Sequence, residues 1–299
     1  MSPRTARTNR APLTGGTPRS SRTWLGRVTL AATLPSVLLV GLVEAASVEA
    51  APIPRTLPSR SAEPAAVPSA AFAGGSLAGQ IGAPKRVKQM VTITSRSWSS
   101  TTATLKAWHR GANGRWRGVH GPVRVRLGYN GWVRKADRRQ STGTTPAGRF
   151  RLPYAFGRLA HPGAHLNYRR FDRTDWWPYE PRDPATYNVW QWHKARTTHW
   201  RADKSEHLWD YYNQYAYGVV VGFNLPSGIH YSHRKRQWVA DHRADTDRGG
   251  GIFLHVNGTG STAGCVSMTR TQMRWLIRWL RPAGHPQLVM GPYSYVTDL

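Results

Sequence analysis

Residues 250–268 read GGIFLHVNGTGSTAGCVSM. The apolar run over 251–256 predicts a buried strand that carries His255 near its end. Small and polar residues follow and predict a loop that turns the chain toward Cys265. Residues 269–280 then place apolar side chains at helical spacing, after a polar Thr and before a proline. The sequence therefore predicts a strand, a loop that carries a cysteine, and a helix.

The rest of the chain predicts further strands on both sides of this unit. Short segments alternate in polarity or carry β-forming side chains, and glycine-rich turns separate the first three of them, which is typical of a β-meander. The strand candidates are residues 89–93, 102–108, 123–127, 149–156, 217–223, 288–290 and 293–296. The expected fold is mainly β, a β-sandwich or mixed sheet, with a helix that follows the cysteine.

A long segment over 166–217 has neither a period of two nor one of 3.6 residues. It is rich in Trp and Tyr, which stand between polar and charged residues. A loop of this length inside a compact domain is typical of a lid or a binding surface. Aromatic faces also suit sugar rings or peptide stems. The alternative interpretation is an aromatic cluster that covers one end of a sheet.

Cys265 is the only cysteine of the chain, so it has no internal disulfide partner. A thiol attacks as the thiolate, and it therefore needs a neighbouring imidazole or a positive environment. His255 is the candidate base. Gly264 leaves room for a substrate backbone, and the amides of Gly264 and Cys265 are candidate donors to an oxyanion. The alternative is that Cys265 is a small buried apolar residue.

The N-terminal part of the chain predicts export followed by a linker. Six arginines precede an uncharged apolar run over 28–43, and alanines follow that run. This order is typical of an export signal in residues 1–50, which becomes a membrane anchor if it is not cleaved. Residues 51–87 are rich in Pro, Ala and Ser and predict a flexible linker. We therefore expect residues 88–299 to form one domain in the cell wall or outside the cell, or facing outward on the anchor.

The charge of the chain is strongly positive, with 42 Lys and Arg against 15 Asp and Glu and a formal net charge of +27. Such a charge attracts anionic polymers. The predicted export favours anionic cell-wall polymers as partners and argues against nucleic acid. No metal site is expected from His230, His233 and His242, because their spacing matches no ligand pattern and the basic residues 234–236 repel a cation.

Three segments resemble the L,D-transpeptidase (YkuD-type) family. His255 followed by TAGCVS at 262–267 resembles the family signature, a strand-borne His and then Ser/Thr-His-Gly-Cys. TTPAGRF at 144–150 looks like its upstream Thr-Pro-x-Gly-x-Phe/Tyr segment. Residues 205–221 are similar to the approach strand of an actinobacterial-looking exported branch. The resemblance covers residues 88–296 and implies a YkuD-type catalytic domain.

This resemblance implies a cysteine acyltransferase that acts on peptidoglycan stem peptides. Cys265 attacks the carbonyl between the third, diamino-acid residue of a stem and its terminal D-Ala, which leaves a thioester. An amine from a neighbouring stem then gives a 3→3 cross-link, whereas water gives L,D-carboxypeptidase activity. His255 accepts the thiol proton and later helps to deprotonate the amine. The resemblance implies no metal and no organic cofactor, and it implies sensitivity to carbapenems.

Two features depart from the family pattern. Ala263 stands where the family has a His before Gly-Cys, and His255 precedes Cys265 by only ten residues (265 − 255). His255 is then the expected base, with Asn257 as a candidate to orient it or, equally, as a turn residue. Further candidate orienting or substrate contacts are Thr262 and Ser267. The departures leave an alternative function, a catalytically weak or inactive cell-wall-binding module of the same fold.

Overall fold

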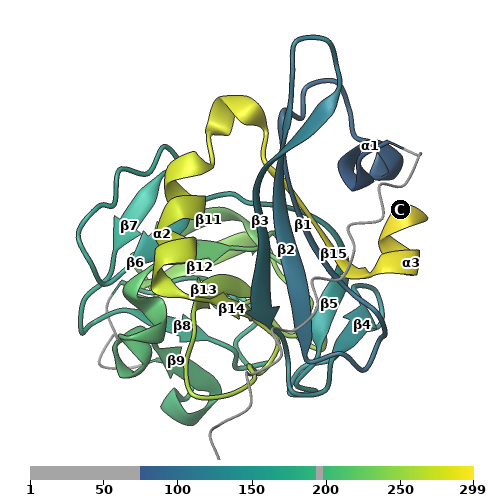
Figure 1. The fold of residues 1–299 in the computed structure, drawn as a ribbon. Helices are drawn as coiled ribbons and strands as arrows, with labels where there is room; N and C mark the ends of the chain where they lie inside the picture. Colours follow the sequence, from purple (N-terminus) through teal and green to yellow (C-terminus); the bar gives the residue numbers. More distant parts are fainter. Residues whose placement is uncertain (1–74, 193–197) are drawn as a thin grey trace, which may run out of the picture. The chain divides into compact units, whose positions relative to one another are not determined.

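The computed structural model describes residues 75–192 and 198–299 (Figure 1). The predicted export signal at 1–50 and most of the predicted linker at 51–87 lie outside these residues. Across the described ranges, no helix has the length and apolar character needed to cross a membrane.

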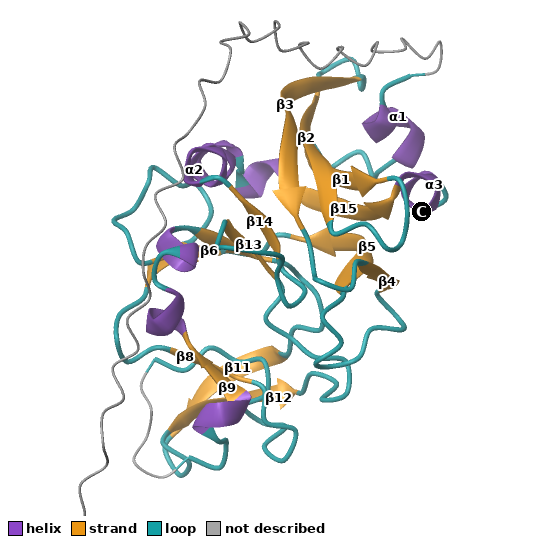
Figure 2. Ribbon diagram, turned by 60° about the horizontal axis from the view of Figure 1, so that its bottom comes forward, coloured by secondary structure: helices purple, strands orange, loops and turns teal. Residues whose placement is uncertain are grey.

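Eleven strands form one mixed sheet in the order β4-β5-β15-β1-β2-β3-β14-β13-β10-β6-β7. Two small sheets, β11-β12 and β8-β9, lie apart from it (Figure 2). The strands are β1 (Gln89–Ser95), β2 (Thr102–Arg110), β3 (Trp116–Arg126), β4 (Trp132–Arg134), β5 (Thr145–Arg151), β6 (Ala155–Gly157), β7 (Tyr168–Arg170), β8 (Trp176–Pro178), β9 (Ser205–His207), β10 (Gly218–Val220), β11 (Ser227–Ser232), β12 (Gln237–His242), β13 (Phe253–Val256), β14 (Val266–Met268) and β15 (Gln287–Pro292). The helices are α1 (Leu77–Ile81), α2 (Arg270–Trp279) and α3 (Tyr293–Thr297), with 3₁₀ helices η1 (Ala202–Lys204), η2 (Leu208–Tyr211), η3 (Gln214–Ala216) and η4 (Pro282–Gly284). The prediction of a mainly β, mixed-sheet domain is confirmed.

The predicted meander is formed by β1, β2 and β3, which are antiparallel neighbours. Along β2, Ala103 and Leu105 are buried whereas Thr104 and Lys106 are exposed. This alternation places one face of the strand against the core, because successive side chains of a strand point to opposite faces. β3 then connects the meander to the strand that follows Cys265 through a single pair with β14.

The predicted helix after the cysteine is confirmed as α2. The Thr269 side chain accepts a hydrogen bond from the Gln272 N–H and so caps its first turn. Met273, Leu276 and Ile277 are buried in the large core. Their spacing puts all three on one face of the helix, which packs against the sheet.

Two short helices correct the predicted boundaries. Residues 293–296, predicted as a strand, form α3 instead. Pro292 ends β15 because it has no N–H to donate to a ladder, and Val296 of α3 is buried. α1 lies within the predicted linker, and its buried residues Ala78 and Ile81 share an apolar cluster with Val296. The folded domain therefore begins before residue 88.

Side chains of β13 alternate between two cores. Leu254 and Val256 belong to the large core that also contains the buried face of α2. Phe253 belongs to an aromatic cluster with Trp177 and Phe156. Because side chains two residues apart share a face, His255 lies on the same face of the sheet as Phe253. The fold therefore places His255 on the face opposite α2.

Candidate active site

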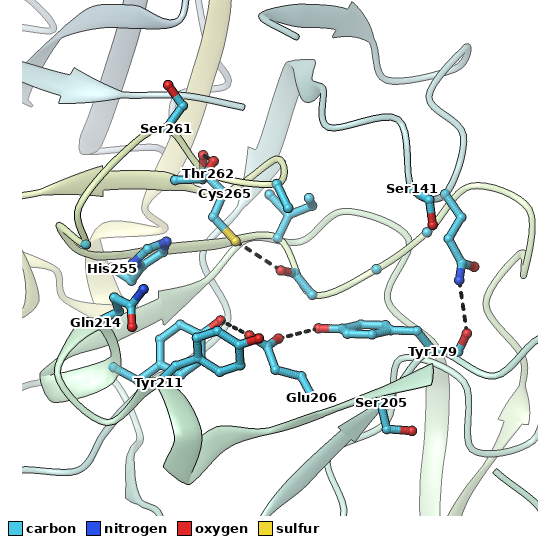
Figure 3. A pocket seen from close by; sticks show the side chains of 18 of the residues that line it. Ser141, Tyr179, Ser205, Glu206, Tyr211, Gln214, His255, Ser261, Thr262 and Cys265 are labelled. Carbon is cyan, nitrogen blue, oxygen red and sulfur yellow. Dashed lines mark hydrogen bonds between the residues drawn. The ribbon is translucent and has the colours of Figure 1, made fainter. Parts of the chain in front are cut away.

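Cys265 and His255 line one pocket of about 550 Å³ and lie along the same wall of it (Figure 3). β13 and β14 are parallel neighbours, with His255 opposite Ser267. Cys265 immediately precedes β14 and shares the face of Ser267, because the side-chain period of a strand is two. The two predicted catalytic residues are therefore diagonal neighbours on adjacent strands.

Two backbone groups hold the Cys265 thiol. The Phe253 N–H donates to Sγ at 3.4 Å, and the thiol donates to the Gly251 carbonyl oxygen at 3.2 Å (Figure 3). Burial raises the pKa of Cys265 to about 12, and the negative charge of Glu206 adds to this rise, which the Phe253 N–H and the positive charge of Arg138 oppose. The thiol is therefore protonated at neutral pH and needs a base to become a nucleophile.

His255 is only 6% exposed, and its Nδ1 lies 2.8 Å from the carbonyl oxygen of Val256. A carbonyl oxygen only accepts, so Nδ1 carries the ring proton and Nε2 is left as an acceptor. Burial lowers the pKa of His255 to about 4, so the ring is neutral at pH 7. A neutral imidazole with an unprotonated Nε2 is the form that can take a proton from a thiol.

Ala263 lines the pocket but offers only a methyl group to it. Among the described residues that line the pocket, His255 is the only histidine. The departure from the family pattern at Ala263 therefore leaves a single imidazole among the described residues that line the pocket, and His255 is the candidate base there.

Asn257 and Ser267, which the sequence analysis nominates as orienting or substrate contacts, bind each other. The Ser267 hydroxyl donates to Asn257 Oδ1 at 2.9 Å, and the Asn257 N–H donates to the Met268 carbonyl at 2.7 Å. The Val256 carbonyl, rather than Asn257, makes the hydrogen bond to the His255 ring. Asn257 and Ser267 thus fasten the ends of β13 and β14 together.

Gly264 and Thr262 shape the turn before Cys265. Gly264 has a φ of 139°, and a Cβ at this position would lie 2.8 Å from the Thr144 carbonyl oxygen, so only glycine fits. The Thr262 hydroxyl accepts the Gly264 N–H at 3.1 Å and donates to the Cys265 carbonyl at 2.6 Å. The Gly264 amide is thus engaged, whereas the Cys265 amide has no partner within residues 75–192 and 198–299. The Cys265 amide remains the candidate oxyanion donor.

The segment at 144–150, which resembles the family's Thr-Pro-x-Gly-x-Phe/Tyr motif, packs against the turn at Gly264. The Thr145 hydroxyl accepts the Gly128 N–H at 2.8 Å as β5 begins, and the Thr144 carbonyl contacts the turn. Buried Arg138 donates through Nε to the Thr144 carbonyl at 3.2 Å and through Nη1 to the Arg248 carbonyl at 2.5 Å. Burial lowers the pKa of Arg138. The sequence analysis missed Arg138, because no motif marks it.

Residues of the aromatic segment at 166–217 lie partly in a buried cluster and partly in the lining of the pocket. Trp177 and Trp200 are buried, as expected of a cluster that covers the sheet. Tyr179 and Tyr215 line the pocket instead, and their hydroxyls donate to the carboxylate of Glu206, which also lines it (Figure 3). The sequence analysis assigned Glu206 no role. Its only signal was an acidic side chain among aromatic residues.

A comparison with known families is consistent with this geometry. The family model of YkuD, the L,D-transpeptidase catalytic domain, matches residues 98–289, which is more than half of the chain. The matched span contains His255, Cys265 and the Thr-Pro-x-Gly-x-Phe segment. Searches of curated proteins and of solved structures found no match. The chain belongs to the YkuD family of L,D-transpeptidase catalytic domains, a family whose members act on peptidoglycan.

Proposed function

We propose that this chain is an exported L,D-transpeptidase that forms 3→3 cross-links between peptidoglycan stem peptides. The observation that carries the proposal is the placement of the Cys265 thiol and a neutral His255 imidazole on adjacent strands of one pocket. L,D-carboxypeptidase activity is the competing outcome of the same chemistry. The strongly basic chain and its predicted export signal support a location in the cell wall, near anionic polymers.

The acylation step begins with proton transfer from the Cys265 thiol to His255 Nε2. Sγ attacks the carbonyl carbon between the diamino-acid residue and D-Ala, and the Cys265 amide donates to the resulting oxyanion. The C–N bond then breaks. His255 returns its proton to the leaving amine of D-Ala, and the stem remains attached to Cys265 as a thioester.

The transfer step reverses these roles. An amine of a second stem attacks the thioester carbonyl, and His255 Nε2 takes one proton from that amine. The C–S bond breaks, and the leaving thiolate recovers the proton from His255. Water in place of the amine gives a free carboxylate. The partition between cross-link and hydrolysis therefore depends on how well the pocket holds the second amine.

Intact-protein mass spectrometry of the full chain with a tetrapeptide stem tests the proposal. On the unchanged protein we expect an adduct whose mass equals that of the stem less D-Ala. We expect this adduct to be attached to Cys265 and to no other residue. We expect no adduct on Cys265→Ala. We expect His255→Gln to be acylated about a hundredfold more slowly than the unchanged protein, which is the lower end of the range for loss of a general base. A carbapenem serves as a second acylating probe.

An adduct of unchanged yield on Cys265→Ala would exclude Cys265 as the nucleophile. Binding to wall sacculi without any adduct on the unchanged protein would favour the alternative, a wall-binding module. A wall-binding module of this fold would have the same raised pKa at the Cys265 thiol, because burial causes the rise whether or not the thiol reacts. Analysis of wall digests from a deletion strain, with loss of 3→3 dimers as the expected result, separates cross-linking from hydrolysis.

A further inference from the structure

Glu206 presents a carboxylate to the same pocket that contains the thiol. Its Oε1 accepts the Tyr215 hydroxyl at 2.5 Å, and its Oε2 accepts the Tyr179 hydroxyl at 2.9 Å (Figure 3). An ionised carboxylate offers about four lone-pair sites. The two tyrosines use two of them, so Glu206 is oriented by its neighbours and still has acceptor capacity for a ligand.

No cation in the described ranges forms an ion pair with Glu206. The nearby Asp203 differs in this respect, because its carboxylate pairs with Arg201 at 2.6 Å. Buried Arg138, which also lines the pocket, donates through Nε and Nη1 to backbone carbonyls and forms no ion pair with Glu206 in the described ranges. In a chain with a formal net charge of +27, Glu206 is thus an unpaired carboxylate in the pocket.

This arrangement has two costs that a bound cation removes. Glu206 is half-buried, burial raises its pKa, and the hydrogen bonds from the Tyr215 and Tyr179 hydroxyls oppose this rise only in part. Its negative charge also opposes ionisation of the thiol and raises the pKa of Cys265. A positive ligand at Glu206 satisfies the carboxylate and brings a favourable charge close to the reacting sulfur.

We propose that Glu206, held by Tyr179 and Tyr215, is a subsite for a primary ammonium group on the diamino-acid side chain of a stem peptide. This inference rests on the proposed function and adds a specificity element to it. An ammonium group has three donors and suits the free acceptor sites of a fixed carboxylate. The group comes either from the donor stem or from the second stem, whose amine becomes the nucleophile after it loses its proton.

Binding to the full chain with Cys265→Ala tests the subsite without any need for turnover. The probes are a tetrapeptide stem with a free side-chain amine at its third residue and the same peptide with that amine acetylated. We expect acetylation to weaken binding at least tenfold by calorimetry. The same comparison with Glu206→Gln added should give less than a twofold difference. Asp203→Asn, which removes an equal charge from the pocket rim, should retain the full discrimination.

Equal binding of the two peptides to the Cys265→Ala chain would overturn the subsite, as would full discrimination in the Glu206→Gln protein. The first comparison needs no change at Glu206, so it can refute the subsite even if that variant does not fold. Loss of stability in Glu206→Gln with unchanged discrimination would mean that Glu206 only fastens Tyr179 and Tyr215. These outcomes are independent of the adduct on Cys265, whose absence would instead defeat the proposed function.

Single-turnover kinetics with Cys265 intact identify the source of the ammonium group. If it belongs to the donor stem, Glu206→Gln slows acylation by the free-amine peptide at least tenfold. If it belongs to the second stem, acylation keeps its rate and the ratio of cross-link to hydrolysis falls at least tenfold. Unchanged acylation together with an unchanged ratio would count against the subsite.

Discussion

The burial of His255 makes a quantitative prediction about stability and pH. Its pKa falls from an ordinary value of 6.5 to about 4 in the folded chain. A depressed pKa means that the unfolded chain binds the extra proton first, so folding stability is lost as the pH falls from 6.5 toward 4. The difference of 2.5 between the two pKa values corresponds to about 3 kcal/mol of unfolding free energy, because one pKa unit is worth about 1.36 kcal/mol. Lowering the pH from 7 to 4 should therefore cost the wild-type protein this amount through His255 alone.

Comparison with His255→Gln isolates this effect from the titration of other groups. The free energy of unfolding is measured by urea denaturation with tryptophan fluorescence, at pH 7 and at pH 4, for both proteins. We expect the wild-type protein to lose about 3 kcal/mol more than the variant between the two pH values. A difference below about 1 kcal/mol would show that His255 titrates in the folded chain nearly as it does in water, and the buried neutral base would be refuted.

Two further predictions concern the turn before Cys265. Gly264→Ala should destabilise the fold by about 1–3 kcal/mol, because Gly264 has a positive φ and an added Cβ would contact the Thr144 carbonyl. Gly260→Ala, where an added Cβ meets open space, should be nearly neutral. Thermal unfolding of both variants tests this prediction, and equal effects would contradict it. Thr262→Val should slow acylation at least tenfold, because the Thr262 hydroxyl hydrogen-bonds the Cys265 carbonyl and the Gly264 amide. Thr262→Ser should restore the rate in the same single-turnover assay. A Thr262→Val protein with the native rate would show that Thr262 does not position Cys265.

Local periodicity predicted the elements around the site better than their assembly. β13 and α2 follow from apolar runs and helical spacing within a dozen residues, and both are present. The insertion of β15 between β1 and β5 pairs Val91 with Leu288, which no local pattern specifies. α3 shows the converse, since β-forming residues at 293–296 adopt a helix after Pro292 where Val296 packs in a tertiary cluster.

The same distinction applies to the site. His255 and Cys265 stand in one short stretch and could be paired from a motif, but their protonation states follow from burial that the stretch does not reveal. Arg138 lines the pocket where it hydrogen-bonds the carbonyl of Arg248, a residue far away in the chain. Glu206 lines it because of the way the aperiodic segment that contains it folds. Residues of this kind have no sequence pattern, since their function is created by tertiary contacts.

The parallel pairing of β13 and β14 explains how His255 and Cys265 can share one pocket although only a short loop connects their strands. Neighbouring strands lie about 4.8 Å apart whatever connects them, so the sheet register, rather than the connecting loop, determines how far the imidazole stands from the sulfur. Residues 258–261 line the pocket. The loop at 258–261 and the pair of His255 and Cys265 are thus positioned separately, so we expect insertions in that loop to change the pocket lining and to leave the register of β13 and β14 intact.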